Sequence, residues 1–159
     1  MALDMNNFTT DMTKKDALYA EKKLRIGIIG TGGIAHSHIK QYLKFDDVEI
    51  VAGADLVPGR AAAFFETYGV TAKCYESHTE MLADESLHLD GVSICTYHRQ
   101  HACCTIDALN KGIHVLLEKP MCVTLEEGLE MIKAEKESGK ILTIGFQPRF
   151  DENMKMVKS

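Results

Sequence analysis

The sequence has no long apolar run and no excess of basic residues. Its 159 residues carry a formal net charge of −5 at pH 7, and no uninterrupted apolar stretch is long enough to cross a bilayer. A nucleic-acid groove needs Lys and Arg clustered on one face, so nucleic acid is not the expected partner. The first 23 residues are polar and lack the apolar middle of a secretory signal. We therefore expect a soluble, cytoplasmic protein with no membrane partner.

The sequence also lacks paired cysteines. The five cysteines are an odd number, and no two of them have C-x-x-C spacing. Several lie inside apolar runs, which indicates buried reduced thiols rather than a disulfide framework. Cys103 and Cys104 are adjacent, and we expect their side chains to point away from each other on a helix. The sequence therefore predicts no metal site.

A glycine-rich turn is the most informative stretch of the chain. The apolar run Ile26–Ile29 stops at Gly30-Thr31-Gly32-Gly33, after which apolar residues recur at helical spacing. Gly30, Gly32 and Ala35 occupy the small positions of the G-x-G-x-x-G/A dinucleotide fingerprint, where they permit the turn, the approach of a pyrophosphate and close helix packing. Free N–H groups of the first helical turn would face the phosphates. The expected cofactor-binding residues here are Gly30, Thr31, Gly32, Gly33 and Ile34.

An acidic residue follows the next apolar run. Val48–Ala54 ends at Asp55, twenty positions after Ala35, which places a carboxylate at the tip of the neighbouring strand. Such a carboxylate can accept hydrogen bonds from both ribose hydroxyls and repels a 2′-phosphate, so we predict NAD rather than NADP. The alternative is that Asp55 only opens the turn that follows. Arg60 could pair with a 2′-phosphate, but we expect it on a helix surface.

The rest of the chain alternates strand and helix patterns. Apolar segments of strand length alternate with helical periodicity, at residues 26–29, 48–54, 70–75, 91–96, 113–117 and 140–145. This alternation predicts an α/β fold with a doubly wound parallel sheet, the Rossmann fold, over residues 24–150. Residues 1–23 are expected to form an N-terminal arm, and residues 151–159 the start of a connection. Ligands of such sheets bind beyond the carboxyl ends of the strands.

A second candidate lies at the end of the fifth predicted strand, in Glu118-Lys119-Pro120. The proline fixes the turn and holds Lys119 at the rim of the crevice that takes the cofactor. A lysine beside a nicotinamide and a substrate hydroxyl can donate a hydrogen bond to the developing oxyanion or pass a proton. The alternative is a surface lysine at a strand end. We predict that Lys119 is catalytic.

Read together, these motifs resemble the amino-terminal domain of the Gfo/Idh/MocA family, which includes glucose-fructose oxidoreductase and inositol dehydrogenase. The resemblance implies an oxidoreductase that transfers a hydride between NAD(P) and a sugar, cyclitol or related polyol. It runs from about Leu24 to Phe150 and rests on Ile26–Ala35, Asp55, Thr96 with His101, Ala108–Val115, Glu118–Met121 and Gly145–Phe150.

The resemblance also assigns roles to individual residues. It places Lys119, with Glu118 before it, near the nicotinamide, and Thr96, Tyr97 and His98 along the nicotinamide ribose. It places His101 at the start of the next helix, beside that site. The family commonly has Pro-Asn where this chain has Tyr97-His98, so the contacts at that turn differ from the family pattern.

The family carries a second, α+β domain that covers the crevice and supplies most substrate contacts. This sequence stops at Ser159, where that domain should begin, so we expect a truncated chain that binds cofactor but is inactive alone. Homo-oligomers are also expected, because the family associates through that domain. One alternative is a non-catalytic dinucleotide-binding sensor or regulatory module. Another is a methyltransferase, which Glu118-Lys119-Pro120 fits poorly.

The remaining histidines have no carboxylate partner at a useful sequence spacing. We therefore expect them to be structural or surface residues. They are His36, His38, His78, His88 and His114.

Overall fold

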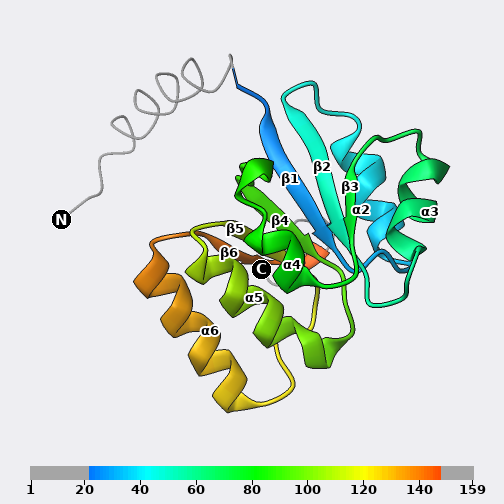
Figure 1. Cartoon of the computed structure of the whole chain (residues 1–159). Coiled ribbons are helices and arrows are strands. Elements are labelled where there is room, and N and C mark those ends of the chain that lie inside the picture. The colour runs from blue at the N-terminus through cyan, green and yellow to red at the C-terminus, as the bar shows by residue number, and fades with distance from the viewer. Residues whose placement is uncertain (1–21, 148–159) are drawn as a thin grey trace, which may run out of the picture.

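The computed structural model describes residues 22–147, which form one six-stranded parallel sheet with helices on both faces (Figure 1). The expected arm and connection, apart from Lys22 and Lys23, lie outside the described residues. The strands are β1 (Leu24–Ile29), β2 (Val48–Ala54), β3 (Lys73–Tyr75), β4 (Gly91–Ile94), β5 (His114–Leu117) and β6 (Leu142–Ile144). The α-helices are α2 (Ala35–Tyr42), α3 (Arg60–Thr67), α4 (His78–Ala83), α5 (His101–Asn110) and α6 (Leu125–Ser138).

The strand order is β3-β2-β1-β4-β5-β6, and every pairing is parallel. The chain builds β1 to β3 outward in one direction, returns to the middle, and builds β4 to β6 outward in the other. The predicted doubly wound sheet is confirmed. Its order reverses between β1 and β4, and a crevice beyond the carboxyl ends of these two strands is where such folds bind ligands.

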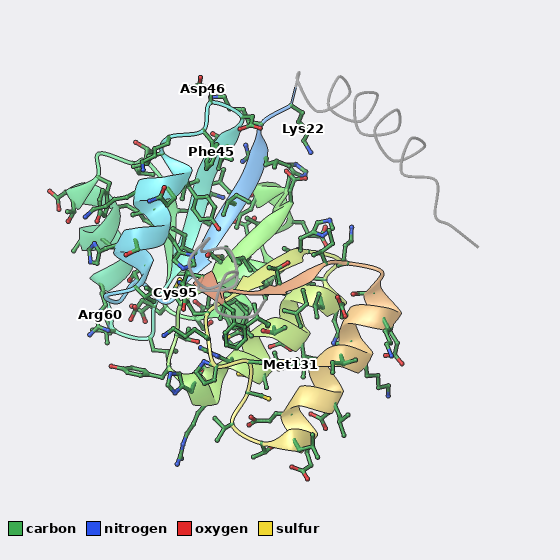
Figure 2. The ribbon with its side chains drawn as sticks, turned by 180° about the vertical axis from the view of Figure 1, so that it is seen from behind. Lys22, Phe45, Asp46, Arg60, Cys95 and Met131 are labelled. Carbon is green, nitrogen blue, oxygen red and sulfur yellow. The ribbon has the colours of Figure 1, made fainter. Side chains whose placement is uncertain are left out.

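Two apolar cores lie on opposite faces of the sheet. Helices α2 and α3 cover one face, where Ile39 and Phe65 pack against Ile28. Helices α4, α5 and α6 cover the other face, where Leu109 and Met131 belong to the larger core (Figures 1 and 2). All four residues of β4 are buried, as expected for a central strand covered on both faces.

Several elements are shorter than the sequence predicts. Strand β3 begins at Lys73 rather than at residue 70, and β6 covers only Leu142–Ile144. Both are edge strands, so each has only one neighbour that can hold it in a ladder. Two short 3-10 helices, η1 (Glu85–Leu87) and η2 (His98–Gln100), were not expected. Among residues 22–147, no helix combines the length and the apolar character that crossing a membrane requires.

Candidate cofactor site

A cavity of about 310 Å³ lies beyond the carboxyl ends of β1, β2 and β4. This volume is at the lower end of the range of small-molecule sites. Figure 2 labels Arg60 and Cys95, two residues of its wall, on the side of the molecule where the strands end. Seven of the residues that the sequence predicts to bind cofactor line this cavity: Gly30, Gly32, Gly33, Ile34, Asp55, Thr96 and Tyr97.

The glycine turn has the geometry that the fingerprint requires. Gly30 has a φ of +83°, and a Cβ there would lie 2.9 Å from the carbonyl carbon and oxygen of Cys95. A Cβ on Gly32 or Gly33 would meet nothing within 4 Å, so these two glycines leave open space on the side of the cavity. Ala35 is fully buried where α2 begins. The turn therefore has room for a pyrophosphate above Gly32.

Asp55 ties the glycine turn to the end of β2. One carboxylate oxygen, Oδ2, accepts hydrogen bonds from the N–H and the hydroxyl of Thr31, each at 2.9 Å, and Oδ1 accepts one from Val57 N–H at 2.9 Å. Burial by itself would raise the pKa of Asp55, but these hydrogen bonds and the charge of Arg60 outweigh it and lower the pKa. Asp55 is therefore a carboxylate at neutral pH. Its hydrogen bond to Val57 also opens the turn that follows β2, which is the structural role considered as the alternative for this residue.

Arg60 is not a distant surface residue. Its Nη1 lies 3.6 Å from Oδ1 of Asp55, and the residue lines the cavity although 46% of its side chain is exposed. Arg60 thus lies on a helix surface, as expected, but it also belongs to the wall of the cavity. The cavity holds one carboxylate and one guanidinium at the position where an adenosine ribose is expected.

Thr96 contributes a hydroxyl that lacks a partner within the protein. Its Oγ1 is one of two buried side-chain polar atoms without a hydrogen bond among residues 22–147, and the residue lines the cavity. Tyr97 also lines the cavity and is largely exposed. A dinucleotide fits this set of groups, because it brings phosphates to the open glycines, ribose hydroxyls to the carboxylate and acceptors to the threonine.

Five of the predicted residues do not line the cavity. They are Thr31, His98, His101, Glu118 and Lys119. Thr31 is 3% exposed and serves to hold the turn on Asp55. His98 lies in η2 and is exposed.

His101 is a buried connector between two loops. Its side chain is fully buried, with Nδ1 2.7 Å from the carbonyl oxygen of Pro120 and Nε2 3.2 Å from that of Thr96. The histidine thus joins the end of β4 to the turn after β5. Both ring nitrogens are engaged with main-chain oxygens, so this geometry favours a positioning role over direct contact with cofactor.

Glu118 is the centre of a buried polar network that the sequence did not predict. Its Oε1 lies 2.8 Å from Nε2 of His38 and accepts a hydrogen bond from Gln147 Nε2 at 3.5 Å, while Oε2 accepts one from the N–H of Lys119 at 3.2 Å. Nδ1 of His38 lies 2.6 Å from Ser93 Oγ. Lys119 itself is exposed and joined to Pro120 by a cis peptide bond. The network fixes the backbone from which Lys119 projects.

Two of the remaining histidines, which the sequence predicts to be structural or surface residues, have carboxylate partners that lie far away in the sequence. His38 pairs with Glu118, and His78 Nε2 lies 2.9 Å from Asp107 Oδ2. The partners are separated by 80 and 29 positions in the sequence, so no local spacing could reveal them. His38 lies three residues after Ala35 and next to Ile39, the two buried residues of α2, and this position on the buried face of the helix was the available signal.

The chain matches known proteins along most of its length. Residues 24–146 match the family model of Gfo/Idh/MocA, an oxidoreductase family with an NAD-binding Rossmann fold. Inositol 2-dehydrogenase of Salmonella typhimurium strain LT2 is 33% identical over 86% of this chain and 40% of its own length. D-glucoside 3-dehydrogenase of Escherichia coli K12 is 37% identical over 80% of this chain and 36% of its own length.

A solved structure agrees with these matches. The WlbA dehydrogenase from Chromobacterium violaceum, in complex with NADH and UDP-GlcNAcA, superposes with a TM-score of 0.80 at 32% identity, over 87% of this chain and 39% of the other. The chain thus spans about 40% of the length of the relatives it matches. On the match over residues 24–146, the chain belongs to the Gfo/Idh/MocA oxidoreductase family with an NAD-binding Rossmann fold.

Proposed function

We propose that this chain binds NAD in the cavity beyond β1, β2 and β4 and forms the cofactor domain of a dehydrogenase that acts on a sugar, cyclitol or related polyol. The observation that carries the proposal is the open space at Gly32 and Gly33 beside an ionised Asp55. The names of the relatives support the substrate class, since they are dehydrogenases of inositol and of a glucoside.

Different residues of this chain would bind different parts of the dinucleotide. N–H groups at the start of α2, around Gly32, would bind the pyrophosphate, and Asp55 would accept hydrogen bonds from the adenosine ribose hydroxyls. Thr96 Oγ1 would donate a hydrogen bond to the cofactor from the end of β4. His101 would hold the Thr96 loop and the Pro120 turn at a fixed separation. The cavity thus orients the dinucleotide across the middle of the sheet.

The chemistry of hydride transfer is supplied by the nicotinamide when it is bound. Lys119 would stand at the rim, where its Nζ can hydrogen-bond the oxygen of a substrate hydroxyl and exchange a proton with it. Glu118 keeps the backbone of Lys119 in place through its hydrogen bond to the Lys119 N–H. In this proposal Lys119 is the catalytic residue, and His38 and Glu118 are positioning residues.

A substitution in the glycine turn tests whether the dinucleotide binds there. Gly32→Ala is expected to weaken NADH binding at least about tenfold without loss of stability, because its Cβ enters only the space reserved for the pyrophosphate. Calorimetric titration of the chain with NADH measures the effect, and S-adenosylmethionine in a parallel titration should not bind. Ser37→Ala, an exposed position of α2 outside the cavity lining, is the control. Equal NADH affinity in Gly32→Ala and wild type would contradict the proposed site.

The preference for NADH over NADPH tests whether Asp55 binds the adenosine ribose. Asp55→Ala is expected to weaken NAD binding by about tenfold and to reduce the difference in affinity between NAD and NADP. The substitution removes a carboxylate that repels a 2′-phosphate, and it releases Arg60 from its ion pair. The affinities of NADH and NADPH should be measured side by side. Thr31→Val removes a hydrogen bond to Asp55 but keeps the carboxylate, so it should affect both cofactors equally. A preference that does not change in Asp55→Ala would exclude Asp55 from the ribose site.

A further inference from the structure

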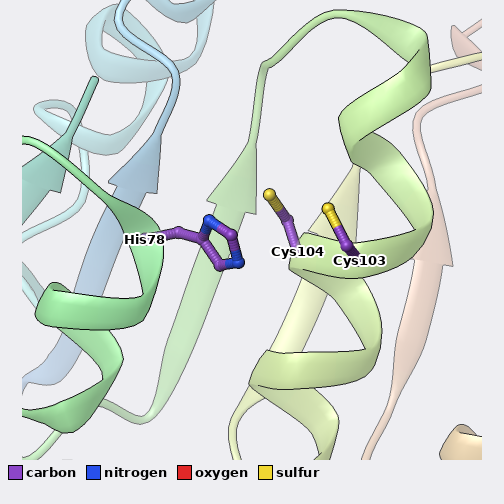
Figure 3. A group of neighbouring side chains, drawn as sticks. All are labelled: His78, Cys103 and Cys104. Atoms are coloured by element: carbon purple, nitrogen blue, oxygen red, sulfur yellow. The ribbon is translucent and has the colours of Figure 1, made fainter. Parts of the chain in front are cut away.

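Three metal-binding side chains converge between α4 and α5. One ring nitrogen of His78 and the Sγ atoms of Cys103 and Cys104 all lie within 4.8 Å of one another (Figure 3). The expectation that the two cysteines point away from each other is therefore wrong. Adjacent helical residues are separated by only about 100° around the axis, and side-chain rotation brings both sulfur atoms into the gap that His78 faces.

We propose that His78, Cys103 and Cys104 bind one Zn²⁺ ion. Zinc prefers thiolate and imidazole ligands in tetrahedral geometry, with Zn–S bonds of about 2.3 Å and Zn–N bonds of about 2.0 Å. In a tetrahedral site two such sulfur ligands lie about 3.8 Å apart, and a sulfur and a nitrogen ligand about 3.5 Å apart. The three atoms, which lie within 4.8 Å of one another, therefore need to approach by no more than about 1.3 Å. Cys103 is exposed, and its thiol donates a hydrogen bond to the carbonyl oxygen of Gln100 at 3.3 Å, whereas Cys104 is buried. The fourth position is open to water or to a neighbouring oxygen.

The surroundings of the cluster favour a metal over isolated thiols. Asp107, one turn beyond Cys103 on α5, places Oδ2 2.9 Å from Nε2 of His78 and so restrains the imidazole beside the sulfur atoms. Carboxylates in such positions orient histidine ligands and strengthen metal binding. Two thiolates would also neutralise the charge of the ion.

A disulfide between the two cysteines fits this helix poorly. Consecutive Cα atoms lie about 3.8 Å apart, whereas disulfides usually join Cα atoms separated by about 4.4–6.8 Å. Residues 103 and 104 lie in the first turn of α5, whose backbone would have to leave the helical conformation to form the bond. A metal ion bridges the two sulfur atoms without that change.

His78 and Cys104 also line the cavity proposed to bind NAD. The metal titration is therefore made without any dinucleotide, and its result does not depend on whether NAD binds in that cavity. The reduced chain, stripped with a chelator, is titrated with Zn²⁺ against a chromophoric competitor and, separately, with Co²⁺. We expect one equivalent of Zn²⁺, a thiolate-to-cobalt charge-transfer band, and at least tenfold weaker binding in Cys103→Ser and His78→Gln. Cys103 is exposed, so its variant should fold, which circular dichroism checks.

Cys74→Ser is the matched control, because Cys74 is an exposed thiol on β3 outside the cluster. It should bind Zn²⁺ like the wild type. The proposal fails if the wild type binds no more tightly than Cys103→Ser, if Cys74→Ser loses as much affinity, or if bound Co²⁺ shows no charge-transfer band.

Discussion

Gly30→Ala is expected to lower the free energy of unfolding by about 3 kcal/mol. The backbone of Gly30 has a φ of +83°, a left-handed conformation that costs a residue with a Cβ about 1–2 kcal/mol. The new methyl group would also lie 2.9 Å from main-chain atoms of Cys95, and such overpacking costs about 1–3 kcal/mol. The neighbour cannot easily move, because Cys95 N–H donates a 2.7 Å hydrogen bond to Ile29 in the adjacent strand.

Gly139→Ala separates these two contributions. Gly139 ends α6 with a φ of +64°, but a Cβ there would meet nothing within 4 Å. Its substitution should cost only the conformational part, about 1 kcal/mol, and the effect of alanine on the unfolded chain is common to both variants. Urea unfolding of the two variants and the wild type gives the comparison. Equal losses would show that the contact between Gly30 and Cys95 adds no strain.

The sequence was sufficient wherever neighbouring residues decide the structure. Strand β2 has the predicted bounds, Val48–Ala54, because an apolar run and a following turn define both of its ends. Thr124 begins α6 with a complete capping box to Glu127, and Gly139 ends it. The edge strands β3 and β6 were overestimated, because a strand extends only as far as its single neighbour can pair with it.

The candidate site was predictable only in part, because some of its contacts join residues that lie far apart in the sequence. The fingerprint spacing located Gly30, Gly32 and Asp55, which do line one cavity. The hydrogen bonds between Asp55 and Thr31 join residues 24 positions apart, and the pair of His38 and Glu118 spans 80. No periodic pattern encodes such contacts, since the first depends on how the ends of β1 and β2 lie side by side and the second on how α2 meets the end of β5. The directions of the Cys103 and Cys104 side chains depend on rotamers, which sequence spacing does not specify.

Glu118→Ala is expected to lower the free energy of unfolding by about 2–3 kcal/mol, because removing the carboxylate leaves the buried Nε2 of His38 without its hydrogen-bond partner. The carboxylate is 5% exposed and lies 2.8 Å from Nε2 of His38, whose side chain is 11% exposed. His38 in turn contacts Ser93, which accepts a hydrogen bond from Tyr42. The substitution therefore removes the acceptor at the end of a network that joins α2, β4 and the end of β5.

Asp107→Ala in metal-free buffer is the matched control for this prediction. Asp107 makes the same kind of contact, 2.9 Å from Nε2 of His78, but 46% of its side chain is exposed, so solvent replaces it and the loss should stay below about 1 kcal/mol. Glu118→Gln keeps the shape and one acceptor oxygen and should recover most of the loss. Chemical denaturation of the three variants at pH 7 measures these differences. If Glu118→Ala and Asp107→Ala lose equal stability, burial does not strengthen the His38–Glu118 pair, and the support that this network gives to the backbone of Lys119 must come from packing alone.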